Sequence, residues 1–109
     1  MPAAGRQGEA RTAIDTFRND YRVAFLHYLP RADESALAEA YELGRTAVAA
    51  GVSVLELSQV HHEVLAAVLR EVRSPDETQH IALAASELLL EVLATSEMAH
   101  RRFNETFGV

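Results

Sequence analysis

Apolar and polar residues alternate along the chain at steps of three and four residues, the period of an α-helix. The first apolar stripe comprises Ile14, Phe17, Tyr21, Ala24, Phe25 and Tyr28. Pro30 ends it, because proline lacks an amide hydrogen and disfavours helical conformation in the preceding residue. We therefore predict a helix over about residues 9–29. Residues 1–8 are small or flexible types, and we predict a flexible tail there, ahead of one helical domain over residues 9–109.

Two further helices are predicted at about residues 34–50 and 54–72, with almost no loop between them. Gly51 suits the left-handed conformation that ends a helix. Ser53 begins the next helix, and with Glu56 it forms a capping box, in which each side chain accepts from the other residue's amide. The pattern predicts a tight antiparallel helical hairpin that contains no catalytic group.

Small residues dominate the apolar face of the second predicted helix, which consists of Leu37, Ala40, Tyr41, Gly44, Ala47 and Val48. A glycine inside a helix costs about 1 kcal/mol relative to alanine. Gly44 therefore indicates that a neighbouring helix approaches closely, and we expect Tyr41 to pack there as well. Glu42 and Arg45 are three residues apart, and we expect them to be exposed and paired on the helix surface.

The third predicted helix carries a broad apolar arc. Its central stripe is Leu57, Val60, Val64 and Val68, widened by Leu55, His62, Leu65, Leu69 and Val72. We interpret His62 as a histidine of the core or of an interface rather than a metal ligand. His61 and His62 are adjacent, so they point about 100° apart and cannot share one metal ion.

The fourth predicted helix begins after Ser74, which forms a second capping box with Glu77, and runs to about residue 107, where Gly108 stops it. Residues 81–93 are apolar nearly all round, and a helix of that kind is buried on every side. One small domain rarely surrounds a helix, so we expect a homodimer. We place its interface at Leu88, Leu89, Val92, Leu93 and Phe103.

Two questions about this helix stay open at the level of sequence. The alternative to the homodimer is a monomer in which this helix is the central helix of the core. Its last turns also extend beyond the shorter third helix, and they need a cover. The first helix, a second subunit and a downstream segment are the three candidates for that cover.

Composition restricts the class of protein. A length of 109 residues corresponds to one domain. The formal charge of −6, without a basic stripe, argues against binding to nucleic acid or to anionic membranes. The chain has no cysteine, which excludes disulfides and zinc–thiolate sites. It also lacks an apolar run typical of a signal peptide or a membrane span, so we expect a cytoplasmic protein.

The candidate chemistry is sparse. The five histidines include no pair at the four-residue spacing of a helical metal site. A Glu-x-x-His motif occurs once, at Glu97 and His100, whereas di-metal bundles need two copies. No Gly-x-Ser-x-Gly elbow or glycine-rich phosphate loop is present. We therefore expect a binding or assembly module without catalytic residues, metal or cofactor. A sensory domain binding a small ligand and an enzyme built on helical carboxylates are the alternatives.

Three segments, in this order and spacing, resemble the N-terminal domain of RsbU-type serine phosphatases. The segments are residues 40–45, residues 51–61 from Gly51-Val52-Ser53 to His61, and residues 91–101. The predicted helix over residues 9–29 also resembles the first segment of the family's sequence pattern. The residues that fit it are Phe17, Tyr21, Leu26, Tyr28 and Leu29. The resemblance extends over about residues 14–103.

The resemblance implies a four-helix domain that forms a two-fold dimer and binds an RsbT-like switch kinase. In bacterial partner switching, that binding activates a PP2C-type phosphatase that controls a stress sigma factor. No phosphatase region lies within the 109 residues, so phosphatase activity is not assigned to them. The candidate partner-binding residues carried over from the family motifs are Glu42, Arg45, His61 and His62. Reversal of charge at Glu42 or Arg45 is expected to abolish kinase binding.

Overall fold

The computed structural model describes the backbone of residues 2–107, together with the side chains of residues 11–102, 104 and 105. This part of the chain forms four α-helices and no strand, which confirms the predicted all-α class. The helices are α1 (Pro2–Tyr28), α2 (Glu34–Ala49), α3 (Val54–Leu69) and α4 (Pro75–Phe107). Gly108, the predicted stop of the last helix, lies outside the described residues.

Helix α1 begins at Pro2 rather than near residue 9, so residues 2–8 are helical where a flexible tail was predicted. The helix preference of the first residues accounts for the difference. Proline is favoured in the first turn of a helix, and the following Ala3 and Ala4 are the residue type that disfavours a helix least. Met1 lies outside the described residues.

The turn between α2 and α3 has the predicted structure. Gly51 has φ 71°, in the left-handed region. The Val52 amide donates to the Ala47 carbonyl at 2.8 Å, which satisfies the end of α2. Ser53 Oγ accepts from the Glu56 amide at 3.1 Å, and Glu56 Oε1 accepts from the Ser53 amide at 2.9 Å. The capping box is therefore complete and fixes where α3 begins.

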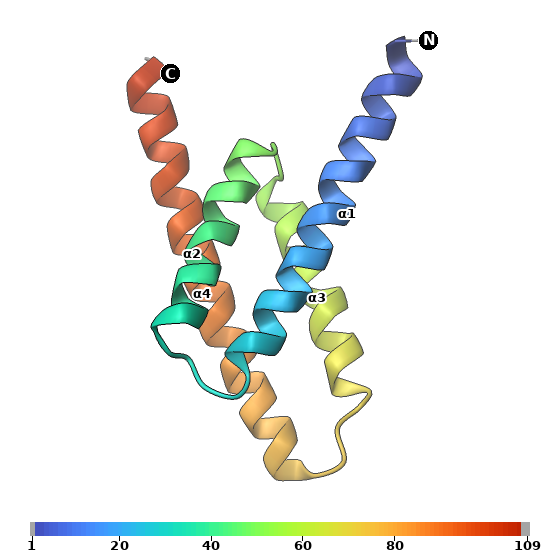
Figure 1. Ribbon diagram of the computed structural model, residues 1–109, viewed down its shortest axis with the longest axis vertical. Coiled ribbons are helices and arrows are strands. Elements are labelled where there is room, and N and C mark those ends of the chain that lie inside the picture. Colours follow the sequence, from blue (N-terminus) through green and yellow to red (C-terminus); the bar gives the residue numbers. More distant parts are fainter. Residues whose placement is uncertain (1, 108–109) are drawn as a thin grey trace.

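Beyond this turn, α2 and α3 diverge. Figure 1 shows α2 beside α4, both running toward the end of the molecule at which the two chain termini lie. Helix α2 packs most extensively against α4 and next against α1, whereas α3 packs against α1 and α4. The first turns of α1 and the last turns of α4 lie on opposite sides of the molecule, so α1 does not cover the end of α4 (Figure 1).

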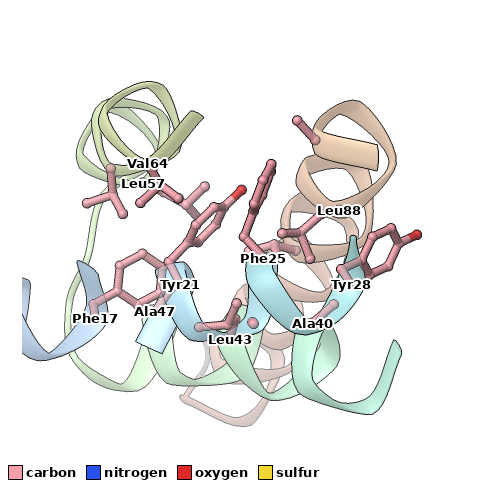
Figure 2. Close-up of a cluster of buried hydrophobic side chains, with 14 of the residues drawn as sticks. Phe17, Tyr21, Phe25, Tyr28, Ala40, Leu43, Ala47, Leu57, Val64 and Leu88 are labelled. Carbon is pink, nitrogen blue, oxygen red and sulfur yellow. The ribbon is translucent and has the colours of Figure 1, made fainter. Parts of the chain in front are cut away.

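Aromatic side chains of α1 form the centre of the core (Figure 2). Phe17, Tyr21, Phe25 and Tyr28 are all buried, as their spacing predicted. They contact the core-facing side chains of the other helices, which include Ala40, Leu43, Ala47, Leu57, Val64 and Leu88. The Tyr28 hydroxyl reaches the surface of α4 and donates to Glu87 Oε2 at 3.3 Å.

The single chain does not cover residues 81–93 on every side, as expected where one small domain cannot surround a helix, and the dimer that would complete the cover stays a prediction. Leu88 and Val92 are completely buried, but Leu83 and Leu90 are 59% and 65% exposed. The reason is geometric, because the buried residues of α4 recur at helical spacing on one face, at Ile81, Ala84, Leu88 and Val92, and the other helices cover only that face. One face of α4 therefore presents leucine to the surroundings.

Candidate partner-binding surface

The outward face of α2 carries two of the predicted site residues. Glu42 and Arg45 are both exposed, as predicted, and Arg45 Nη1 lies 3.6 Å from Glu42 Oε1. An exposed ion pair of this length contributes little stability, at most about 1 kcal/mol. Both side chains are therefore available to bind another protein.

Tyr41 does not pack in the core, contrary to the prediction. Its side chain is 48% exposed, because the buried face of α2 is centred on Ala40, Leu43, Gly44 and Ala47. This face is rotated away from the one inferred from periodicity. Tyr41 consequently lies at the edge of the contact between α2 and α4.

α4 approaches α2 closely at Gly44, which confirms the expected packing role. A Cβ atom on Gly44 would lie 2.6 Å from Thr95 Cβ and 2.7 Å from the carbonyl oxygen of Val92. The same atom would lie 2.8 Å from the amide nitrogen of Ser96. Two of these neighbours are backbone atoms, so a larger residue would force the helices apart.

Next to Gly44 the two helices form a shallow groove of about 270 Å³. We call it the α2–α4 groove, and its residues are Tyr41, Arg45, Thr95, Met98, Ala99 and Arg102. Met98 is 52% exposed, and Arg102 is exposed without an ion pair to any residue that the structure describes. The sequence indicated Arg102 as a candidate interface residue at the end of a helix, but it did not predict that Met98 and Arg102 lie beside Tyr41 and Arg45, because only the packing of the two helices places them there.

His61 and His62 lie elsewhere. His61 is half-buried and its Nδ1 lies 2.8 Å from the Tyr21 hydroxyl of α1. Burial lowers the pKa of His61, and the neighbouring His62 lowers it further. His62 is exposed, so its interpretation as a core histidine was wrong for the single chain. No contact described in the structure brings these histidines to Glu42 or Arg45.

The predicted dimer-interface residues divide into three groups. Leu88 and Val92 are covered by their own chain, so in this fold they offer no surface to a second copy. Leu89 and Leu93 are partly buried against the core. The side chain of Phe103 lies outside the described residues. Leu83 and Leu90 are the exposed leucines of this helix, and their seven-residue spacing places them on one face.

A second groove lies between the α2–α3 turn and α4, with a volume of about 600 Å³. We call it the turn groove. Its lining is mostly apolar, and His100 and Glu97 lie at its polar side. Its residues are Val48, Gly51, Val52, Ser53, Val54, Leu93, Ser96, Glu97 and His100.

The described part of the chain shows neither a metal site nor a membrane-spanning helix. No group of three or more metal-ligating side chains converges among the described residues. No helix in this segment is both long and apolar enough to cross a membrane.

Comparison with known protein families gives a match to the family described as phosphoserine phosphatase RsbU, N-terminal domain, over residues 19–99. The matched segment includes all of α2 and α3 and most of the described core. No curated protein and no solved structure matches the chain.

Proposed function

The chain belongs to the family of RsbU N-terminal domains, and from this membership we propose that it is a non-catalytic regulatory module that binds an RsbT-type switch kinase. Binding of the kinase turns on a PP2C-type phosphatase output in bacterial partner switching, which acts on the stress sigma factor pathway. The observation that carries the proposal is the family match over residues 19–99. In the Glu-x-x-His pair of Glu97 and His100, Glu97 accepts from Arg101 at 3.0 Å in a surface ion pair.

The surface of the molecule is consistent with a role in protein recognition. Tyr41, Arg45 and Met98 are exposed around one groove, and tyrosine, arginine and methionine are enriched at protein interfaces. The contact with the kinase therefore includes the exposed face of α2 at Arg45, whose ion-pair partner is Glu42. The α3 histidines His61 and His62 form at most a separate contact.

The proposal includes a two-fold homodimer. Leu83 and Leu90 expose a leucine face on α4 that the single chain leaves uncovered. Covering that face removes apolar area from water, which favours association. Leu83 and Leu90 replace the buried Leu88 and Val92 as the residues that meet the second copy.

Titration calorimetry of the recombinant chain with the RsbT-type kinase of the same organism tests the proposal. We expect saturable binding, and no phosphatase activity from the chain alone on a phosphorylated anti-anti-sigma factor. Absence of binding at micromolar concentrations of both proteins overturns the proposal.

The turn groove favours a second candidate function, a sensory domain that binds a small molecule. Its volume of about 600 Å³ lies within the range of small-molecule sites, roughly 300–1,000 Å³. Native mass spectrometry of the purified chain tests this candidate. A mass increment that disappears on denaturation supports it, and a bare protomer or dimer mass argues against it.

A further inference from the structure

The α2–α4 groove gathers exposed cations on an acidic chain. The formal charge is −6, yet Arg45 and Arg102 line the same groove. Arg102 has no ion pair among the described residues, and Arg45 has only the 3.6 Å contact with Glu42. Guanidinium groups bind carboxylates through paired hydrogen bonds, so two of them side by side favour an acidic partner.

The same groove has an apolar part. Tyr41 and Met98 are about half exposed, and the small Ala99 leaves room between them. The Thr95 hydroxyl at the base donates to the Glu91 carbonyl at 2.9 Å, so it is already satisfied. The Tyr41 hydroxyl makes no hydrogen bond to a described residue and is available to donate to a carboxylate.

Helix geometry places these groups together. Tyr41 and Arg45 are four residues apart on α2, and Met98 and Arg102 are four residues apart on α4, so each pair shares a helix face. The contact at Gly44 brings the two faces side by side. The volume of about 270 Å³ lies below the range typical of small-molecule pockets, which favours the anchor side chain of a protein segment.

We propose that the α2–α4 groove docks an acidic, amphipathic segment of the partner kinase. One apolar side chain of that segment lies between Tyr41 and Met98, and carboxylates on either side bind Arg45 and Arg102. This inference rests on the proposed function, since it names the surface and the chemistry of the kinase contact. Glu42 competes with the segment for Arg45 and does not itself bind the kinase.

Charge variants test the proposal by titration calorimetry with the kinase. We expect the double variant Arg45→Glu/Arg102→Glu to bind at least about tenfold more weakly. Glu42→Gln is expected to bind more tightly, because it frees Arg45. The matched control is Arg22→Glu/Arg70→Glu, which makes the same charge change at exposed positions of α1 and at the end of α3 and is expected to bind as wild type.

Cross-linking identifies the carboxylates directly. The chain contains ten arginines and no lysine, so it has no side-chain amine. Arg102→Lys therefore introduces a single side-chain amine that a carbodiimide can couple to a carboxylate. We expect its cross-links to the kinase to fall on one Asp- or Glu-rich segment. Arg22→Lys is the control and is expected to give none.

The outcomes separate the two proposals. If the kinase does not bind the wild-type chain, the proposed function fails and this inference fails with it. If the kinase binds wild type and the Arg45→Glu/Arg102→Glu variant equally well, the docking surface is wrong and the proposed function stands. Circular dichroism of each variant, expected to match wild type, shows that weaker binding does not come from unfolding.

Discussion

The Tyr21 hydroxyl on α1 lies 2.8 Å from Nδ1 of His61 on α3, and their rings meet edge to face with centroids 5.8 Å apart. The hydroxyl has no other acceptor among the described residues, so it donates and Nδ1 accepts. Tyr21 is completely buried, and burial raises the pKa of its hydroxyl. Burial lowers the pKa of His61 and so favours its neutral imidazole, and in that form Nδ1 accepts from Tyr21 and the contact joins α1 to α3.

The first prediction concerns pH. Burial lowers the pKa of folded His61 below 6.5, so the unfolded chain binds more protons in that range. The contribution of His61 to stability is complete above about pH 6.5 and is lost as the pH falls through the folded pKa. We expect His61→Gln, whose amide oxygen can still accept from Tyr21, to remove this loss. Urea unfolding of both proteins between about pH 5 and pH 8 measures it.

His62→Gln is the control for the pH prediction. Burial is the larger cause of the lowered pKa of His61 and His62 is the smaller one, so this variant should keep most, but not all, of the wild-type dependence of stability on pH. Arg18 and Glu63, which pair at 2.7 Å near this contact, remain unchanged in all the proteins compared. Identical pH profiles for wild type and His61→Gln would show that the imidazole is not held neutral by the fold.

The second prediction concerns the crossing of α2 and α4. Gly44→Ala introduces a Cβ atom 2.6 Å from Thr95 Cβ and close to backbone atoms that cannot rotate away. Overpacking of this kind costs about 1–3 kcal/mol, which exceeds the gain of up to about 1 kcal/mol in helix propensity. We expect a lower Tm for Gly44→Ala in thermal unfolding. Ala38→Ser, which adds one atom at an exposed position of α2, should lower it less, since serine costs at most about 0.7 kcal/mol in helix propensity.

The third prediction separates the core of α4 from its exposed face. Leu88→Ala should lower the free energy of unfolding by about 2–5 kcal/mol, because Leu88 is completely buried. Leu83→Gln/Leu90→Gln should change it little and should instead weaken the dimer. Sedimentation velocity over a range of concentrations measures the second effect. A wild-type chain that sediments as a 12.0 kDa monomer at micromolar concentration contradicts the dimer.

The fourth prediction concerns the α2–α3 turn. Ser53→Ala removes the side-chain oxygen that accepts from the Glu56 amide, and we expect a loss of about 1 kcal/mol. Gly51→Ala should cost about 1–2 kcal/mol, because its left-handed φ of 71° crowds a Cβ atom even where nothing else lies near it. Ser58→Ala, at an exposed position inside α3, is the control for denaturant unfolding. Equal stability of Ser53→Ala and this control would show that the cap contributes nothing.

Local chemistry made much of this fold predictable from sequence. The start of α3 follows from Ser53 and Glu56, and the end of α2 follows from Gly51, because these signals act within one turn of chain. The aromatic stripe of α1 was also predictable, since Phe17, Tyr21, Phe25 and Tyr28 repeat with the helical period on a face with few competing apolar residues.

The candidate site was predicted only in part. The exposure of Glu42 and Arg45 followed from their charge, whereas Tyr41 was wrongly predicted to pack in the core. His62, interpreted as a histidine of the core or of an interface, does not lie in the core, and its place in an interface stays a prediction. Adjacent helical residues point about 100° apart, so the rotation of each helix about its axis decides which of two neighbours is buried. Where apolar residues surround a helix, as on α4, periodicity does not define that rotation.

The sequence by itself determined four helices, the caps of the α2–α3 turn and the aromatic core of α1, because those depend on backbone hydrogen bonds and spacing within one segment. At the start of α4 the predicted capping box is only half formed, since Glu77 accepts from the Arg73 amide rather than from the Ser74 amide. The tertiary structure alone decided that α2 packs against α4, through the missing side chain of Gly44. That contact brings Arg45 and Arg102 into one groove and leaves Leu83 and Leu90 uncovered. Such relationships depend on the crossing of helices distant in sequence, and no local pattern encodes them.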